Sequence, residues 1–106
     1  MASGRVEIYH NGVWGSVCNN SWEIQDSHVA CRMLGFPRAL DFNTNAKYGQ
    51  ATGMIWLDNV QCNGDEESLF HCSHSQWGQH NCNHSNVVVI QCLNSAGMPF
   101  AVRLRI

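Results

Sequence analysis

The cysteines of this chain are the residues whose chemistry is most specific. Six of them are spread over most of its 106 residues. An even number in so short a chain is typical of a disulfide framework formed in an oxidising compartment, whereas unpaired buried thiols are typical of a cytosolic protein. We therefore expect disulfides and an extracellular location, while the spacing alone leaves the pairing open. The positions are Cys18, Cys31, Cys62, Cys72, Cys82 and Cys92.

Histidines stand close to two of these cysteines, in the patterns Cys72-x-His74 and His80-x-Cys82-x-His84. Cysteine and histidine together can bind zinc, but this spacing fits no zinc motif, and the cysteines are better used as disulfides. We expect no metal here, and we expect His80 and His84 to form hydrogen bonds within their loop.

Two asparagines lie in Asn-x-Ser patterns, Asn19-Asn20-Ser21 and Asn83-His84-Ser85. This pattern is the acceptor of N-linked glycans in secreted proteins, although so short a pattern also arises by chance. We expect a glycan on at least one of Asn19 and Asn83.

Catalytic chemistry has no comparable signal. The cysteines are committed, no set of Ser, His and Asp has a supporting motif, and Glu66 and Glu67 lie at the start of a predicted helix. The four tryptophans are interpreted as core or disulfide-packing residues rather than a ligand platform. We expect no enzyme activity and no cofactor.

The composition indicates one folded domain. Apolar residues make up 44% and charged residues 13%, and the formal net charge of -2 excludes a basic field over the whole chain that would drive nucleic-acid or membrane binding. No apolar run approaches the roughly 18 residues that span a bilayer. We interpret residues 1–3 as an expression scar in front of an excised ectodomain.

The elements that position these residues are predicted from pattern. Asn11-Gly12 between the alternating runs 5–10 and 13–18 predicts a β-hairpin, because both turn positions favour a positive φ. Apolar residues at helical spacing predict a helix over 26–35 that Asp26 or Ser27 caps and Gly35 ends. The remaining segments are a loop over 36–53, a strand over 54–62 with a turn at Asp58-Asn59, a short helix over 64–72, a polar loop over 73–86, and a strand over 87–92.

Together, the ordered motifs strongly resemble a scavenger receptor cysteine-rich domain of the six-cysteine type, group A, over residues 4–92. They are GRVEI at 4–8, NGxWGxVC at 11–18, VACRMLGF at 29–36, GQ at 49–50, IWLDNVxC at 55–62 and WGxHNCxH at 77–84. The resemblance implies an α+β fold: a small disulfide-rich domain whose curved antiparallel sheet cradles one main helix, plus a short second helix. It also implies the pairs Cys18–Cys82, Cys31–Cys92 and Cys62–Cys72.

The resemblance further implies an extra strand before residue 4, which this chain lacks. The alternating segment 100–106, after a linker over 93–99, looks like that strand. We expect it to fill the first-strand position, either within its own chain or in a strand-swapped dimer or neighbouring repeat.

Many members of the family hold a cation with two aspartates after the first cysteine and an acidic pair further on. Here those positions are Asn19-Asn20 and Asn86-Val87, so we expect no metal at them. Asp58, in a family position near a second cation, is interpreted as a turn former.

The resemblance implies extracellular, non-enzymatic recognition of protein, glycan, polyanionic or microbial ligands, in a secreted protein or an ectodomain. Arg32, Arg38 and Lys47 are the candidate contacts to polyanions. The alternative is a structural or regulatory spacer: one repeat of an array, or an accessory to a protease or oxidase.

Overall fold

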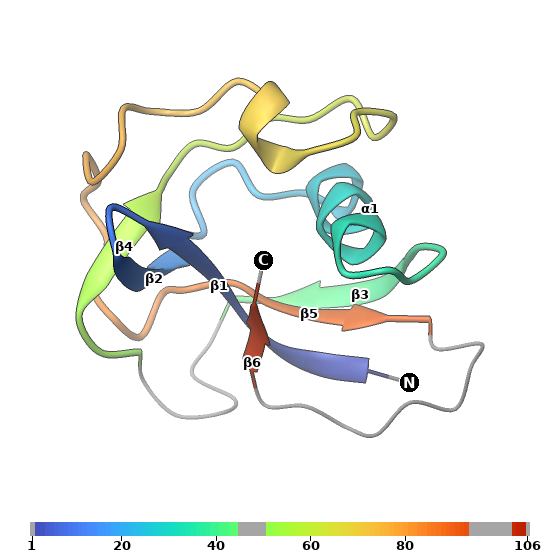
Figure 1. The fold of residues 1–106 in the computed structure, drawn as a ribbon, viewed down its shortest axis with the longest axis horizontal. Coiled ribbons are helices and arrows are strands. Elements are labelled where there is room, and N and C mark those ends of the chain that lie inside the picture. The colour runs from blue at the N-terminus through green and yellow to red at the C-terminus, as the bar shows by residue number, and fades with distance from the viewer. Residues whose placement is uncertain (1, 45–50, 94–102, 106) are drawn as a thin grey trace.

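A curved sheet of six strands forms the body of the domain, and helix α1 packs on one side of it (Figure 1). The structure is a computed structural model that describes residues 2–44, 51–93 and 103–105. The sheet has the order β3-β5-β1-β2-β4, and β6 also pairs with β1. The expected α+β fold is confirmed, with two strand pairs, β2–β4 and β1–β6, parallel rather than antiparallel.

The predicted hairpin is present as β1 (Ala2–His10) and β2 (Val13–Val17). Asn11 has φ 50° and Gly12 has φ 77°, as a two-residue hairpin turn requires. Strand β1 begins before the predicted run, since Ala2 pairs with Cys92 and Ser3 pairs with Gln91.

Helix α1 (Ile24–Met33) begins two residues ahead of its predicted start. Glu23 is the N-cap, so the prediction that Asp26 or Ser27 caps the helix is wrong. Asp26 lies in the first turn, where its Oδ2 accepts the Glu23 N–H at 2.7 Å. Gly35, with φ 92°, follows the helix as predicted.

The predicted loop over 36–53 contains an edge strand, β3 (Ala39–Asn43), which pairs antiparallel with β5 (Val89–Cys92). The prediction of a continuous loop is therefore wrong. This strand depends on distant partners: the sheet edge of β5, and His28 of α1, whose Nδ1 accepts the Ala39 N–H at 3.0 Å. Its own five residues, ALDFN, carry little strand signal.

Strand β4 (Met54–Leu57) pairs in parallel with β2 and ends at the predicted turn, where Asn59 has φ 54°. The predicted helix over 64–72 is only one 3₁₀ turn, η1 (Leu69–His71), capped by Ser68. The acids expected in its first turn precede it, and the Glu66 carboxylate accepts backbone N–H groups of Asn63 and Gly64 instead.

Strand β6 (Arg103–Arg105) pairs in parallel with residues 5–7 of β1. It lies within the predicted strand 100–106, whose other residues fall outside the described part of the chain.

Between the sheet and α1 lies the main hydrophobic core. Val6 and Ile8 of β1 face it with no exposed surface, and so do Val29 and Cys31 of α1. Trp22 is also buried, and its Nε1 donates to Ser27 Oγ at 2.7 Å. This core holds β2 and the loops that follow it in fixed positions.

Candidate functional site

Three disulfides fasten the loops to the sheet and the helix. Cys31–Cys92 joins α1 to β5 inside the core, where both residues are fully buried. Cys18, next to the end of β2, joins Cys82 of the loop over 79–86, and Cys62 joins Cys72 across ten residues. These are the pairs that the family resemblance implies.

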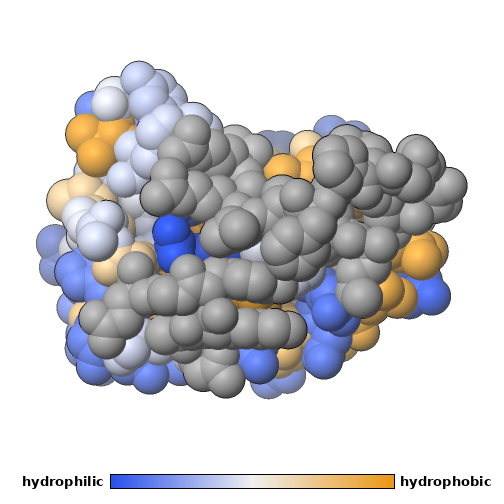
Figure 2. All heavy atoms as spheres, turned by 90° about the horizontal axis from the view of Figure 1, so that it is seen from below, coloured by the Kyte–Doolittle hydropathy of each residue, from blue (hydrophilic) through white to orange (hydrophobic). Residues whose placement is uncertain are grey.

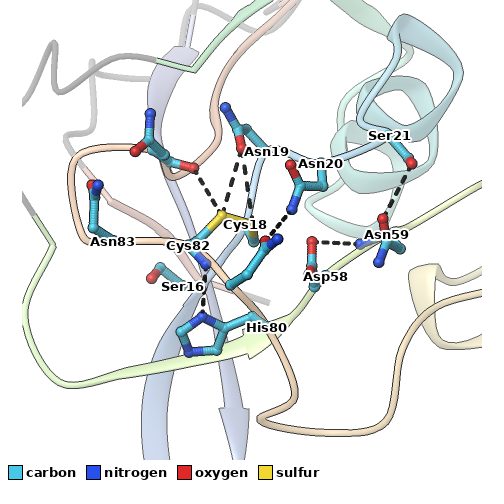
Figure 3. Close-up of a disulfide and its surroundings, with 12 residues drawn as sticks. Ser16, Cys18, Asn19, Asn20, Ser21, Asp58, Asn59, His80, Cys82 and Asn83 are labelled. Atoms are coloured by element: carbon cyan, nitrogen blue, oxygen red, sulfur yellow. Dashed lines mark hydrogen bonds between the residues drawn. A yellow bond between two sulfur atoms is a disulfide. The ribbon is translucent and has the colours of Figure 1, made fainter.

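Four asparagines surround the Cys18–Cys82 disulfide: Asn19, Asn20, Asn81 and Asn86, here called the amide cluster. The Asn19 N–H donates to the Asn86 carbonyl at 3.1 Å, which ties the two loops together. Asn19 Oδ1 lies 3.6 Å from Cys82 Sγ, and Asn20 Nδ2 donates to Asn81 Oδ1 at 2.7 Å (Figure 3). The positions where the resemblance implies carboxylates therefore hold three neutral amides and Val87, and the Asn20 amide bonds to a further amide, that of Asn81.

Asp58 lies beside this cluster and is 3% exposed. Its Oδ1 accepts the Asn59 N–H at 2.8 Å, and the Asn59 side chain links Ser21 Oγ (3.3 Å) to Ser75 Oγ (3.1 Å). Asp58 thus takes part in the turn, as the sequence predicts.

The donor atoms at the amide cluster do not fit a high-affinity calcium site. Calcium binds six to eight oxygens and gains affinity from negative carboxylates. Among the described residues, one group of potential ligand atoms lies here, from Cys18, Asp58 and Cys82. Two of its three atoms are disulfide sulfurs, which carry no charge, so one carboxylate is left. The second such group, Cys62, Glu66 and Cys72, also offers two disulfide sulfurs.

The three candidate polyanion contacts differ in their surroundings. Arg32 is exposed at the end of α1, and its Nη2 donates to the carbonyls of Gly64 (2.6 Å) and Glu66 (3.0 Å). Arg38 is exposed and donates to the Ala39 carbonyl at 3.3 Å. Lys47 lies outside the described residues. Arg32 therefore also fastens the loop that precedes η1.

The histidines near the cysteines bond to the backbone. His80 Nδ1 accepts the Cys82 N–H at 3.1 Å, and His84 Nε2 lies 2.7 Å from the Gly53 carbonyl. His74 Nδ1 lies 2.6 Å from the Ser75 carbonyl. The expected hydrogen bond within the loop is therefore present for His80, whereas His84 bonds to Gly53 in a different segment of the chain.

Exposed aromatic residues were missed by the sequence analysis. Tyr9 and Trp14, here called the aromatic pair, lie opposite each other on β1 and β2 with ring centroids 5.0 Å apart. Tyr9 is 55% exposed and Trp14 37%. The interpretation of the tryptophans as core residues holds for Trp22 and Trp56, but Trp14 lies at the surface. Tyr9 alternates with the apolar residues of β1, on the same side as Arg5 and Glu7, and the hairpin register places Trp14 opposite it. This pattern could have predicted that both rings lie on the outer face of the hairpin.

Trp14 also lines a cavity of about 140 Å³, together with the ion pair Arg5–Glu7, whose N···O distance is 3.2 Å. Arg5 is 6% exposed and Glu7 9%, so this pair is largely withdrawn from water. The rest of the lining comes from Gly15, Ser16, Ala51 and Thr52. The cavity thus adjoins the aromatic pair and has a polar lining.

Asp26 is a buried carboxylate that ties α1 to the strand-to-loop segment at Cys62. Its Oδ1 accepts the Cys62 N–H at 2.6 Å, while its Oδ2 accepts the Glu23 N–H. Burial raises the pKa of Asp26 above its ordinary value, against the lowering effect of these two hydrogen bonds. Its role is therefore structural, within the core that supports the site.

The fold and the site define a small, disulfide-locked α+β module whose described residues show no converging catalytic set. The family model of the scavenger receptor cysteine-rich domain matches residues 1–93. The chain belongs to this family.

Known proteins agree with this assignment. Lysyl oxidase homolog 2 of Xenopus laevis is 46% identical over 84% of this chain and 12% of that protein. Human CD5 antigen-like is 45% identical over 87% of this chain and 27% of that protein. The chain thus spans a small part of the curated relatives it matches, which are multidomain proteins.

Among solved structures, the dimeric form of the SRCR domain of mouse MARCO has a TM-score of 0.80 with 44% identity, covering 86% of each chain. The third SRCR domain of murine neurotrypsin has a TM-score of 0.74 with 40% identity, covering 85% of this chain and 84% of that one. Among the described residues, no helix is long and apolar enough to cross a membrane.

Proposed function

We propose that this chain is an extracellular, non-enzymatic recognition module that binds protein, glycan, polyanionic or microbial ligands without a calcium ion. Family membership supports the module, since the relatives are scavenger-receptor-like and lysyl oxidase homolog proteins. The neutral amide cluster supports a mode of binding that needs no cation, because one nearby carboxylate is too little charge for tight calcium binding.

The aromatic pair is the observation that carries the proposal. Tyr9 and Trp14 present aromatic surface on a hairpin held by the core. Aromatic side chains supply much of the binding energy at protein interfaces and stack on sugar rings. Val13, 46% exposed, precedes Trp14 on β2, so its side chain points to the opposite face of the hairpin and is not part of this surface. We assign ligand contact to this hairpin, with Arg32, Arg38 and Lys47 as a separate contribution to polyanion binding.

A test measures binding of the chain to two immobilised probes, mannan and dextran sulfate, in EDTA. Tyr9→Ser with Trp14→Ser is expected to weaken binding by about tenfold or more. Leu40→Ser is the matched control, because Leu40 is 39% exposed on β3 and outside the hairpin. Replacing Arg32, Arg38 and Lys47 by Gln is expected to weaken binding to dextran sulfate and to make that binding less sensitive to salt. Binding to mannan should not change. An equal loss for Leu40→Ser and the double variant would contradict the assignment to the hairpin.

A second candidate is the spacer, favoured by the pairing of β6 with β1. A strand that pairs with residues 5–7 of β1 in its own chain can pair in the same way with β1 of a second copy, as in domain swapping. We propose that segment 100–106 fills the first-strand position, in its own domain or in the next repeat or second copy. Figure 2 views the domain from below, and hydrophobic residues there lie in separate areas among hydrophilic ones.

Removing residues 99–106 tests this role. The truncated chain is expected to unfold at a lower temperature or to change its oligomeric state, as followed by calorimetry and light scattering. If both properties stay unchanged, segment 100–106 does not fill the position. Failure to bind either probe, together with association that depends on residues 99–106, would favour the spacer over the recognition module.

A further inference from the structure

Both Asn-x-Ser patterns of the chain lie at the same disulfide, but their two asparagines differ in exposure. The Cys18–Cys82 bond and the hydrogen bond from the Asn19 N–H to the Asn86 carbonyl hold the two loops together. Asn83 is exposed, whereas Asn19 is half-buried. Figure 3 shows the Asn83 side chain apart from the disulfide and the Asn19 oxygen directed at the sulfurs.

The Asn83 pattern forms a local turn in which the serine and the asparagine bond directly. Asn83 Oδ1 accepts the Ser85 N–H at 2.9 Å and also the Ser85 hydroxyl, and the Asn83 carbonyl accepts the Asn86 N–H at 3.1 Å. Both side-chain bonds end on Oδ1. The nitrogen Nδ2, which N-glycosylation modifies, takes no part in them.

The Asn19 pattern is held by residues from other loops. The Asn19 carbonyl accepts the Trp22 N–H at 3.1 Å, which closes a tight turn, and Ser21 has φ 66°. The Ser21 hydroxyl donates to Asn59 Oδ1 at 3.3 Å instead of to Asn19. Asn19 Oδ1 faces the sulfurs at 3.6 and 3.9 Å. A sugar on Asn19 would therefore begin in the seam between the two disulfide-linked loops.

From this contrast we infer that Asn83, and not Asn19, carries an N-linked glycan on the mature chain. Nδ2 of Asn83 attacks the anomeric carbon of a lipid-diphosphate-linked oligosaccharide. The new bond joins Nδ2 to that carbon, the carbon–oxygen bond to the diphosphate breaks, and Nδ2 loses one proton as the lipid diphosphate leaves. The inference rests on the extracellular placement in the proposed function.

The position of the glycan also determines which surface stays open. A bulky, hydrated glycan on Asn83 lies next to the amide cluster, since Cys82 and Asn83 are adjacent in the chain. Its first sugar begins one residue away from the Cys18–Cys82 disulfide. The aromatic pair lies on β1 and β2, which do not include this loop.

The test expresses the chain behind a secretion leader in cultured animal cells. Secreted and cell-associated chains are both treated with a peptide N-glycosidase in heavy-oxygen water, and the peptides are analysed by mass spectrometry. The expected result is conversion of Asn83 to labelled Asp, with Asn19 unchanged. Conversion of Asn19, of both asparagines or of neither would overturn the inference.

Five variants complete the experiment. Asn83→Gln and Ser85→Ala are expected to abolish the electrophoretic shift that the glycosidase removes, while Asn19→Gln and Ser21→Ala leave it intact. Ser85→Thr keeps the hydroxyl and is expected to keep the shift. Probe binding of the unglycosylated Asn83→Gln chain is measured separately, so that loss of the glycan and loss of the recognition function give different results.

Discussion

At the scale of single residues, the replacement of charge by amides has the largest consequence for function. Asn19 and Asn20 stand where the family resemblance implies aspartates, and they bond to backbone and amide groups nearby. Asp58 keeps its carboxylate but uses it in the turn at Asn59. Neutral amides at these positions are compatible with the fold but lack the negative charge on which calcium affinity depends.

Asp26→Asn is expected to lower the free energy of unfolding by about 1–3 kcal/mol. Asp26 accepts the Glu23 and Cys62 N–H groups with two different oxygens and is 1% exposed. An asparagine offers one acceptor and turns an NH₂ group toward the other N–H. Urea denaturation measures the change, with Asp65→Asn, at an exposed position, as the control. Equal stability of the two variants would contradict the structural role of Asp26.

Glu66→Gln is expected to change the dependence of stability on pH. Backbone N–H groups of Asn63 and Gly64 bond to the Glu66 carboxylate at 2.8 and 2.9 Å and lower the pKa of Glu66 below its ordinary 4.5. Because the folded pKa is lowered, the stabilisation is present above pH 4.5 and is lost as the pH falls through the folded pKa. The difference in melting temperature between the native chain and the variant should therefore shrink in acid. A constant difference between neutral and strongly acidic pH would be inconsistent with this origin.

At the scale of elements, those fixed by local sequence signals were predicted, whereas those that depend on partners elsewhere in the chain were missed. The hairpin was predicted because Asn11-Gly12 fixes its turn locally, and both residues have positive φ. Strand β3 was missed because its pairing with β5, about fifty residues later, and its bond to His28 of α1 both come from outside the segment itself. The acids of 65–67 suggested a helix start, but Glu66 folds back on the backbone N–H groups before η1.

Gly15→Ala is expected to destabilise the hairpin by about 1–3 kcal/mol through overpacking. A Cβ at Gly15 would lie 2.4 Å from Trp56 Cδ1. Trp56 cannot easily move, because its Nε1 donates to the Val13 carbonyl at 2.9 Å. Urea denaturation followed by tryptophan fluorescence measures the loss. Thr52→Ala, at an exposed loop position, should change stability by less than about 0.5 kcal/mol, and a Gly15→Ala chain as stable as this control would refute the packing argument.

At the scale of the whole molecule, the disulfides are expected to contribute in the order of the loops they close. Cys31–Cys92 spans 61 residues and Cys62–Cys72 spans 10. The chain-entropy relation gives about 4 kcal/mol for the first and about 3 kcal/mol for the second. Replacing Cys31 and Cys92 by serine also places two polar groups in the core, so this variant should lose more stability than the variant without Cys62–Cys72. Calorimetric melting of the two double-serine variants checks the order, and the reverse order would contradict it.

The site was predictable only in part, for a physical reason. The sequence shows which residues are asparagines, and the family resemblance supplied the positions of the missing carboxylates. It did not show that the Ser21 hydroxyl bonds to Asn59, because this contact depends on how two separate loops meet, whereas Ser85 bonds to Asn83 within one local turn. The exposure of Trp14 was missed for the same reason, since the four tryptophans look alike until the sheet places them.

Calcium titration by isothermal calorimetry tests the central claim, recognition without a cation, most directly. The native chain is expected to give no heat beyond dilution, even at about millimolar calcium, the range of weak extracellular sites. The variant Asn19→Asp with Asn20→Asp restores two carboxylates beside Asp58 and is the positive comparison. Binding of calcium by the native chain with a micromolar Kd would contradict the account.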